Sequence, residues 1–279
     1  MNVSTKLIGF AATLAVLVGG GIALGGAVDP DRSTAEPGAA HGGDDMADHP
    51  VRGVAVAENG LRLVLDDPEL TPGRTERLSF RVVDEDGAVV RDFDVAHTKR
   101  MHVIVARRDL TGFQHLHPAQ AADGTWTLPL CIADPGSYRL FADFEREGEK
   151  TTLATDLRVD GAADLKPLPA PAAVAVSDGG YDVALDAEEA APGEEGHLDF
   201  TVSKHGREVQ TEPYLGAGGH LVALREGDLA FLHVHPTDEE SGSAISFGAT
   251  FPTPGRYRLF LQFKIDGRVQ TVAFTQEVQ

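Results

Sequence analysis

Two short histidine motifs stand out in this chain of 279 residues. One reads FQHLHP and places His115 and His117 two residues apart; the other reads FLHVHP and places His233 and His235 in the same way. Imidazoles are good ligands for Zn²⁺ and Cu²⁺. Because residues two apart in a strand share one face of a sheet, each motif is expected to present its two imidazoles side by side.

A further histidine precedes each motif by thirteen positions. In the second motif, HLVALREGDLAFLHVH reads as two strands joined at Gly227 and Asp228, a pair that favours a two-residue type II′ turn. Counting outward from that turn places His220 directly opposite His235 and diagonal to His233. All three side chains would then share one face, within reach of a common ligand.

The first motif has the same spacing around Asp109 and Leu110. The same count places His102 opposite His117. A one-residue bulge in either hairpin would turn the leading histidine to the other face, so the metal interpretation depends on the register.

The spacing therefore predicts one three-histidine metal site in each half of the chain. Such a set suits Cu²⁺ or Zn²⁺ and leaves a coordination position open. Two other interpretations remain, a hydrogen-bonded structural cluster and a pH-sensing cluster. The predicted metal ligands are His102, His115, His117, His220, His233 and His235.

The two halves are copies of each other. TPGRTERLSF at 71–80 matches APGEEGHLDF at 191–200, and ADPGSYRLFADF at 133–144 matches PTPGRYRLFLQF at 252–263. The three histidines of one half match those of the other at a constant offset of 118 positions. The chain is therefore a tandem repeat.

The elements that position the histidines are short alternating strands bounded by Gly, Pro or Asp, such as RLSFRVVDEDG and MHVIVARRD. We expect an all-β chain with two tandem antiparallel β-sandwiches, immunoglobulin-like or cupredoxin-like, after an N-terminal hydrophobic helix. The expected domains are a signal-anchor or signal peptide at 1–28, a flexible tether at 29–50, repeat 1 at 51–160, a Pro-rich linker at 161–172 and repeat 2 at 173–279.

The N-terminal segment indicates export. Residues 7–28 carry no charged side chain, so they suit either an uncleaved membrane anchor or a cleaved signal peptide. Both place the rest of the chain outside the cytoplasm. The net charge of −19 argues against nucleic acid as a partner, which needs basic patches.

The remaining ligand-type residues are weaker candidates. Cys131 is the only cysteine, so it forms no intrachain disulfide, and we expect it to be a small buried core residue. His97 aligns with Leu215 and is expected to be solvated. The tether holds ligands that could reach a copper site: His41, Met46 and His49.

PYLGAGGHLVAL…FLHVHP and KRMHVIVARRDLTGFQHLHP resemble actinobacterial secreted or membrane-anchored proteins described as uncharacterised or heavy-metal-binding. They are also similar to immunoglobulin-like YtkA-type modules of extracytoplasmic proteins. The resemblance covers most of residues 51–279 and implies a metal-handling protein on the export side of the membrane.

These observations favour a non-enzymatic extracytoplasmic protein that buffers or presents copper or zinc. An alternative is a tandem immunoglobulin-like interaction module with structural histidine clusters. A third is a three-histidine metalloenzyme, because two histidines on one strand and a third on its neighbour resemble the zinc site of carbonic anhydrase. The sequence identifies no protein partner.

Overall fold

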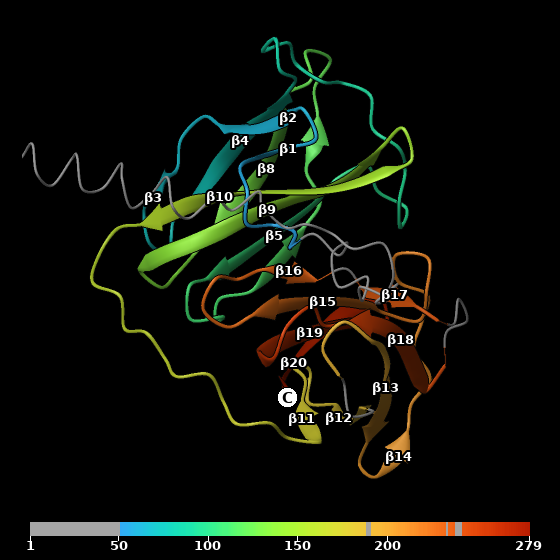
Figure 1. The fold of residues 1–279 in the computed structure, drawn as a ribbon. Helices are drawn as coiled ribbons and strands as arrows, with labels where there is room; N and C mark the ends of the chain where they lie inside the picture. Colours follow the sequence, from blue (N-terminus) through green and yellow to red (C-terminus); the bar gives the residue numbers. More distant parts are fainter. Residues whose placement is uncertain (1–50, 188–190, 233, 238–241) are drawn as a thin grey trace, which may run out of the picture. The chain divides into compact units, whose positions relative to one another are not determined.

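The computed structural model describes residues 51–187, 191–232, 234–237 and 242–279. All regular structure in these ranges is β-strand, and the strands form two tandem β-sandwiches, so the predicted fold class is confirmed (Figure 1). The expected N-terminal helix and the tether at 29–50 lie outside the described residues. Within the described ranges, no helix is long and apolar enough to cross a membrane.

Repeat 1 is built from two five-stranded sheets. Every pairing in them is antiparallel except that of β3 with β10. The first sheet has the order β1 (Ala57–Glu58), β2 (Leu61–Leu65), β4 (Thr75–Val83), β8 (Trp126–Cys131) and β7 (Ala119–Gln120). The second has the order β3 (Glu69–Leu70), β10 (Glu149–Val159), β9 (Gly136–Arg146), β5 (His102–Arg107) and β6 (Gln114–Leu116).

Repeat 2 follows the same plan. One sheet has the order β11 (Val174–Val176), β12 (Asp182–Ala187), β13 (Glu195–Lys204), β18 (Ala244–Thr250) and β17 (Val234–Pro236), and β14 (Arg207–Glu208) pairs with β13. The other has the order β16 (Phe231–Leu232), β15 (His220–Arg225), β19 (Gly255–Ile265) and β20 (Arg268–Val278).

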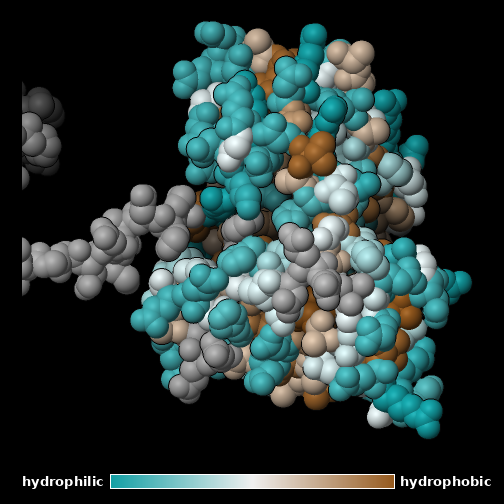
Figure 2. Space-filling view, turned by 90° about the vertical axis from the view of Figure 1, so that its right-hand side faces the viewer, coloured by the Kyte–Doolittle hydropathy of each residue, from teal (hydrophilic) through white to brown (hydrophobic). Residues whose placement is uncertain are grey.

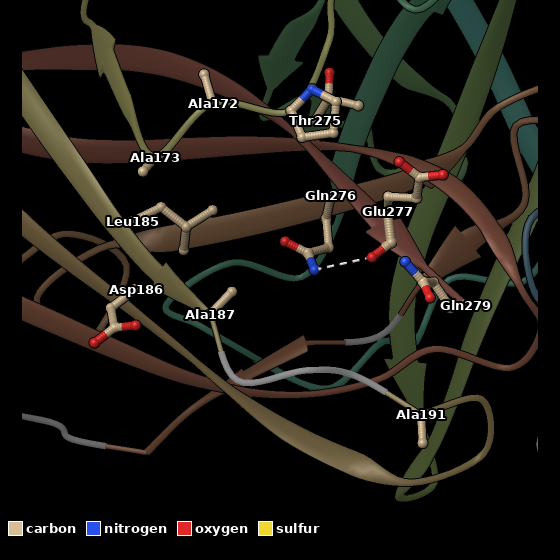
Figure 3. Close-up of a pocket in the computed structure, with 11 residues that line it drawn as sticks. Ala172, Ala173, Leu185, Asp186, Ala187, Ala191, Thr275, Gln276, Glu277 and Gln279 are labelled. Atoms are coloured by element: carbon tan, nitrogen blue, oxygen red, sulfur yellow. Dashed lines mark hydrogen bonds between the residues drawn. The ribbon is translucent and has the colours of Figure 1, made fainter.

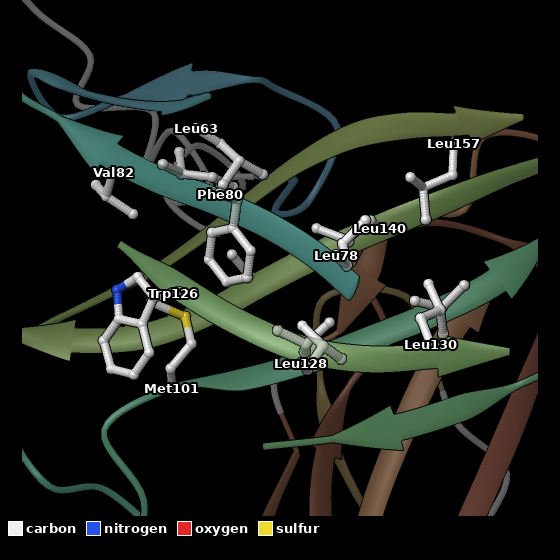
Figure 4. Packing of buried hydrophobic residues seen from close by; sticks show 14 of the residues in the cluster. Leu63, Leu78, Phe80, Val82, Met101, Trp126, Leu128, Leu130, Leu140 and Leu157 are labelled. Atoms are coloured by element: carbon white, nitrogen blue, oxygen red, sulfur yellow. The ribbon is translucent and has the colours of Figure 1, made fainter. Parts of the chain in front are cut away.

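Each sandwich has its own apolar core, formed by the inward-facing residues of alternating strands. In repeat 1, Leu78 of β4 lies beside Leu140 of β9 on the facing sheet, and Phe80 of β4 belongs to the same core (Figure 4). Burial of each such side chain stabilises the fold by about 1.5–3 kcal/mol. Cys131 does not join this core: it is exposed, because alternation along β8 turns Leu130 inward and Cys131 outward. The expectation of a buried cysteine was wrong.

Both repeats contain a tyrosine corner. The hydroxyl of Tyr138 donates to the carbonyl of Asp134 at 2.8 Å, and that of Tyr257 donates to the carbonyl of Thr253 at 2.8 Å. This hydrogen bond back to the preceding turn is characteristic of immunoglobulin-like sandwiches. Together with the sandwich architecture, it supports the immunoglobulin-like variant of the predicted fold.

The strands that carry His102 and His220, β5 and β15, are buried on both faces. In β5, Val103 belongs to the core of repeat 1, whereas Ile104 belongs to a third apolar cluster. In β15, Val222 belongs to that same third cluster. We call this cluster the junction, because it contains residues of both repeats within one compact unit. Its members are Ile104, Ala106, Leu110, Phe141, Ala154, Leu168, Val222, Leu224, Leu229, Phe231 and Phe260.

Aromatic pairs relate the two sides of the junction by an approximate two-fold symmetry. Phe113 of repeat 1 stacks on Phe260 of repeat 2, with ring centroids 4.0 Å apart. The equivalent residues make the converse contact, because Phe231 of repeat 2 lies 5.7 Å from Phe141 of repeat 1. Each repeat therefore offers the same surface to the other, as in an isologous dimer.

Candidate functional site

The hairpin of β5 and β6 has the register predicted from the sequence. Val103 pairs with Leu116 and Ile104 with His115, so the next step of the ladder places His102 opposite His117. Val103 faces the core of repeat 1, and its neighbours on either side therefore face the junction. His102, His115 and His117 therefore all lie on the face of this hairpin that is turned toward the junction.

The turns that set the register differ from expectation. In repeat 1, Leu110 donates its backbone N–H to Arg107 and adopts a left-handed φ of 64°. In repeat 2 the loop is longer than the predicted type II′ turn, because the backbone of Arg225 pairs with that of Ala230. Leu229 adopts the left-handed conformation there, with φ of 60°. The register of β15 with β16 still agrees with the count from the sequence.

The first three histidines converge. One nitrogen atom from each of His102, His115 and His117 lies within 4.8 Å of the other two. We call this set the triad. Nδ1 of His102 lies 3.0 Å from Nε2 of His115. For comparison, two imidazole nitrogens on one tetrahedral Zn²⁺ lie about 3.3 Å apart, since each Zn–N bond is 2.0–2.1 Å long.

In His102 and His115, one ring nitrogen faces the other histidine and we call it the inner nitrogen; the other, outer nitrogen contacts an oxygen atom. The contact of the outer nitrogen determines whether the inner nitrogen carries a proton or a lone pair. Nε2 of His102 lies 3.2 Å from the carbonyl oxygen of Ala96, and Nδ1 of His115 lies 2.8 Å from Oε1 of Gln262. Oxygens of this kind only accept, so both outer nitrogens must donate. In the neutral rings, the two inner nitrogens are then bare lone pairs that face each other at 3.0 Å.

The amide of Gln262 is oriented by its own contacts. Its Nε2 donates to Oγ1 of Thr271 at 3.3 Å, and its Oε1 accepts from the hydroxyl of Tyr214 at 3.4 Å. Both hydroxyls can donate or accept, so they fit either orientation of the amide; in the structure, Oε1 is the atom that faces His115. Gln262 comes from β19 of repeat 2, so the orientation of an amide in repeat 2 sets the tautomer of a histidine in repeat 1.

His117 adds a third unsatisfied nitrogen. Its Nε2 is buried and makes no hydrogen bond. An unpaired buried polar atom costs about 1–3 kcal/mol, so it indicates a missing partner. Burial, reinforced by His102, lowers the pKa of His117 to about 4. Burial, with His102 and His117 adding to it, lowers the pKa of His115 to about 3.

The predicted second triad is not assembled among the described residues. After β16 the chain crosses to the other sheet of repeat 2, where His235 pairs with Gly248 of β18. Nε2 of His235 lies 3.2 Å from a carboxylate oxygen of Glu195, and half of the side chain is exposed. His220 lies in β15, which belongs to the four-stranded sheet of β16, β15, β19 and β20. The expectation that His220 faces His235 was wrong, and His233 lies outside the described residues.

His220 instead joins the histidines of repeat 1. Its ring stacks on His115 with centroids 4.7 Å apart and on His102 with centroids 5.5 Å apart. Burial, followed by the neighbouring imidazoles, lowers the pKa of His220 well below its usual value. A buried neutral imidazole is ready to bind a cation without first losing a proton.

The sequence interpretation missed two residues of the cluster. His97, expected to be solvated, lies 6.1 Å from His102 and 5.7 Å from His220 between ring centroids. It sits in a two-residue turn closed by reciprocal backbone bonds between Ala96 and Lys99, with φ of 49° at His97 and 66° at Thr98. A left-handed β-branched residue is strained, and such strain concentrates at functional sites. Gln262 gave no signal at all in the sequence.

Two other features lie apart from the histidines. The tether residues His41, Met46 and His49 lie outside the described residues. An open pocket of about 650 Å³ is lined by the end of the linker, part of β12 and the end of β20 (Figure 3). Its charged side chains, Asp186 and Glu277, point in different directions, and no histidine lines it. The triad is therefore the candidate site.

Several solved structures resemble the chain at low identity. An adhesin of Escherichia coli, FdeC, is 14% identical, with a TM-score of 0.28 over 81% of this chain and 66% of that one. A Salmonella alpha-2-macroglobulin that had reacted with methylamine is 16% identical, with a TM-score of 0.29 over 84% of this chain and 15% of that one. Invasin, a bacterial integrin-binding protein, is 15% identical, with a TM-score of 0.22 over 77% of this chain and 39% of that one.

The chain thus spans less than two thirds of each of these proteins, and superpositions this loose transfer none of their properties to it. No curated protein matches the chain. One family model matches it twice, at residues 55–161 and 174–279, so both repeats are covered. The chain therefore belongs to the family described as "Domain of unknown function (DUF8832)" and carries two copies of that domain in tandem.

Proposed function

We propose that this protein is a non-enzymatic extracytoplasmic metal-binding protein that holds one Cu²⁺ or Zn²⁺ ion per chain on His102, His115 and His117. The role is to buffer or present the ion. The proposal replaces the two sites expected from the sequence with one, because only the first three histidines converge among the described residues.

The observation that carries the proposal is the pair of opposed lone pairs on His102 and His115. With Oε1 of Gln262 facing His115, two bare nitrogens lie 3.0 Å apart and repel each other. Without a cation, relief requires His102 to lose its bond to Ala96, or the amide of Gln262 to turn its NH₂ group toward His115. A cation between the two nitrogens turns the repulsion into two bonds. The unpaired Nε2 of His117 supplies the third.

The outer hydrogen bonds of the triad also suit a metal site. Ligating histidines commonly donate their second N–H to a carbonyl or carboxylate, which fixes the ring and raises its basicity. The carbonyl of Ala96 serves His102, and the amide oxygen of Gln262 serves His115. Neutral imidazoles favour Zn²⁺ and Cu²⁺ over hard cations such as Mg²⁺.

The proposed location rests on the sequence. Residues 7–28 would either anchor the chain in the membrane or be removed as a signal peptide. Both routes place the repeats outside the cytoplasm, where a metal buffer would meet ions entering the cell.

The alternative is a tandem immunoglobulin-like interaction module whose histidines only pack against one another. The stacking of His220 on His102 favours it, since stacked rings need no ion. The face drawn in Figure 2 is mostly hydrophilic, with hydrophobic side chains in small, separate groups. That face offers no large apolar patch for a protein partner.

Metal titration of the purified full-length chain distinguishes the two functions. We expect one equivalent of Zn²⁺ or Cu²⁺ per chain, measured by calorimetry and by mass spectrometry of the native protein. His117→Ala should weaken binding at least tenfold. His235→Ala is the matched control, because that exposed histidine lies on the other sheet, and it should bind like the wild type. Absence of binding, or equal effects of the two variants, would support the interaction module.

A further inference from the structure

A histidine of repeat 2, His220, packs against the triad of repeat 1. His220 begins β15, and the alternation of that strand places it on the same face as Val222 and Leu224. These two residues belong to the junction, whereas the intervening Leu221 belongs to the core of repeat 2. The ring of His220 is therefore delivered to the triad by the same packing that joins the repeats.

The spacing of the rings fits a single shell of ligands. Imidazoles bound tetrahedrally to one ion have centroids about 5 Å apart, given metal–nitrogen bonds of 2.0–2.1 Å. Within the triad, the centroid distances are 5.2 Å, 5.0 Å and 4.8 Å. His220 lies 5.5 Å from His102 and 4.7 Å from His115. His220 thus lies at the distance of a fourth ligand from two of the three rings of the triad.

The remaining difference between His220 and the triad is the orientation of the ring. His220 stacks on His102 with only 7° between the ring planes, and its nitrogens are not among the converging atoms. The torsion that turns an imidazole about its Cβ–Cγ bond has broad, shallow minima, so the torsion itself opposes reorientation only weakly. One metal–nitrogen bond is ample compensation for the lost stacking contact.

We propose that repeat 2 completes the metal centre, with His220 as the fourth ligand of the ion held by His102, His115 and His117. This proposal rests on the proposed function. It specifies a closed four-histidine centre, with no position for water or substrate, which is the form of structural rather than catalytic zinc sites. It also favours Zn²⁺ over Cu²⁺, since Cu²⁺ prefers a tetragonal arrangement.

His97 is the competing candidate for the fourth position. It comes from repeat 1, and its centroid distance of 6.1 Å from His102 is longer than the 5.5 Å between His220 and His102. Its backbone is held in the left-handed conformation by the turn from Ala96 to Lys99, which limits its approach. His97 therefore serves as an internal comparison for His220.

Co²⁺ is a suitable probe, because its visible absorption reports both coordination number and exchange of ligands. We expect the full-length wild type to bind one Co²⁺ with the intense absorption of a four-coordinate site, and added azide should not change the spectrum. His220→Ala should still bind one equivalent, since the triad remains, but its affinity for Zn²⁺ should fall by at least the roughly 10–100-fold that loss of an outer-shell partner costs. Its Co²⁺ spectrum should respond to azide.

Chemical rescue separates ligation from a structural effect of the substitution. Free imidazole should restore the closed spectrum of His220→Ala, because it can occupy the vacated coordination position, whereas a packing defect would not respond. His220→Asn keeps a polar side chain of similar size and should behave like His220→Ala. His97→Ala and His235→Ala should both keep the wild-type spectrum and its resistance to azide.

The two proposals fail in different ways. No metal binding by the wild type, or binding that His117→Ala does not weaken, overturns the proposed function itself. Metal binding by the wild type with a spectrum that already responds to azide overturns only the fourth ligand. The same holds if His220→Ala matches the wild type, or if His97→Ala opens the site instead.

Discussion

His102 and His220 occupy equivalent positions in the two repeats and stack on each other across the junction, with ring planes 7° apart. The approximate two-fold symmetry of the aromatic pairs extends to this contact. Two copies of one motif have therefore contributed to one cluster, instead of each forming its own site.

Gln262 should control metal affinity without touching the metal. Gln262→Leu removes the acceptor that holds His115 in its Nδ1–H tautomer, at the 2.8 Å bond between the repeats. Loss of such a support typically weakens metal binding 10–100-fold. Calorimetry with Zn²⁺ measures the affinity, and nitrogen-15 NMR of the metal-free protein reports the tautomer. Gln262→Glu keeps an acceptor and should restore both; equal losses in the two variants would contradict the role.

Acid should destabilise the metal-free protein well above the range in which carboxylates protonate. The pKa is lowered to about 3 for His115 and to about 4 for His117, chiefly by burial, whereas histidines in the unfolded chain titrate near 6.5. Between pH 6.5 and 4 the unfolded state binds more protons than the folded state, so the free energy of unfolding falls as the pH is lowered.

The thermal unfolding midpoint at pH 7 and at pH 4.5 measures this dependence. The double variant His115→Gln, His117→Gln should show a smaller drop between these pH values than the wild type, since two of the buried bases are gone. Comparison of the two proteins cancels the contribution of carboxylates such as Asp143, whose pKa burial raises. Parallel drops would show that the two histidines do not set the acid sensitivity.

The aromatic stack at the junction should contribute measurably to stability. Phe113→Ala removes the ring that lies 4.0 Å from Phe260, and for this partly buried residue we expect a loss of about 2 kcal/mol in the free energy of unfolding. Urea denaturation measures it. Val95→Ala, at a side chain that is 66% exposed, is the control and should change the free energy by less than about 0.5 kcal/mol. Equal effects would show that the stack adds no stability.

Gly53 should be intolerant of any side chain. Its φ is 67°, and an added Cβ would lie 2.7 Å from Cβ of Phe231 and 2.8 Å from a ring carbon of Phe141. Gly53→Ala therefore combines backbone strain with a clash on both sides of the junction, and should cost about 2 kcal/mol or more. Gly87→Ala meets nothing within 4 Å at a similar φ of 82°, so it isolates the strain alone. Thermal unfolding of the two variants should differ clearly.

Much of the fold could be predicted from the sequence, because it depends on local pattern. Alternation along strands such as β4 and the repeated PG-x-YRLF segment specify tandem sandwiches, and the spacing of His102 and His117 specifies the register of their hairpin. Register follows from the number of residues between the strands. In repeat 2 the observed register therefore matches the predicted one, although the turn is of a different type from the one predicted.

The rest depended on contacts between segments far apart in the chain. His235 left the predicted cluster because the chain changes sheet before it, whereas in repeat 1 the equivalent His117 follows directly on β6 and stays in the triad. Gln262 lies 147 positions from His115, and the packing of the repeats alone brings them together. Nothing in the local sequence of either residue reports that packing.

The junction also has a consequence for how the repeats stay together. Because β10 ends at Val159 and β11 begins at Val174, a short linker joins the two sandwiches, and Leu168 within it is buried in the junction. A tether of this length gives the repeats an effective concentration of the order of millimolar toward each other. Even a weak attraction between the equivalent surfaces of the two repeats then suffices to keep them together. The sequences of the two repeats can therefore differ at the junction, and repeat 2 has Gln262 at the position where repeat 1 has Asp143.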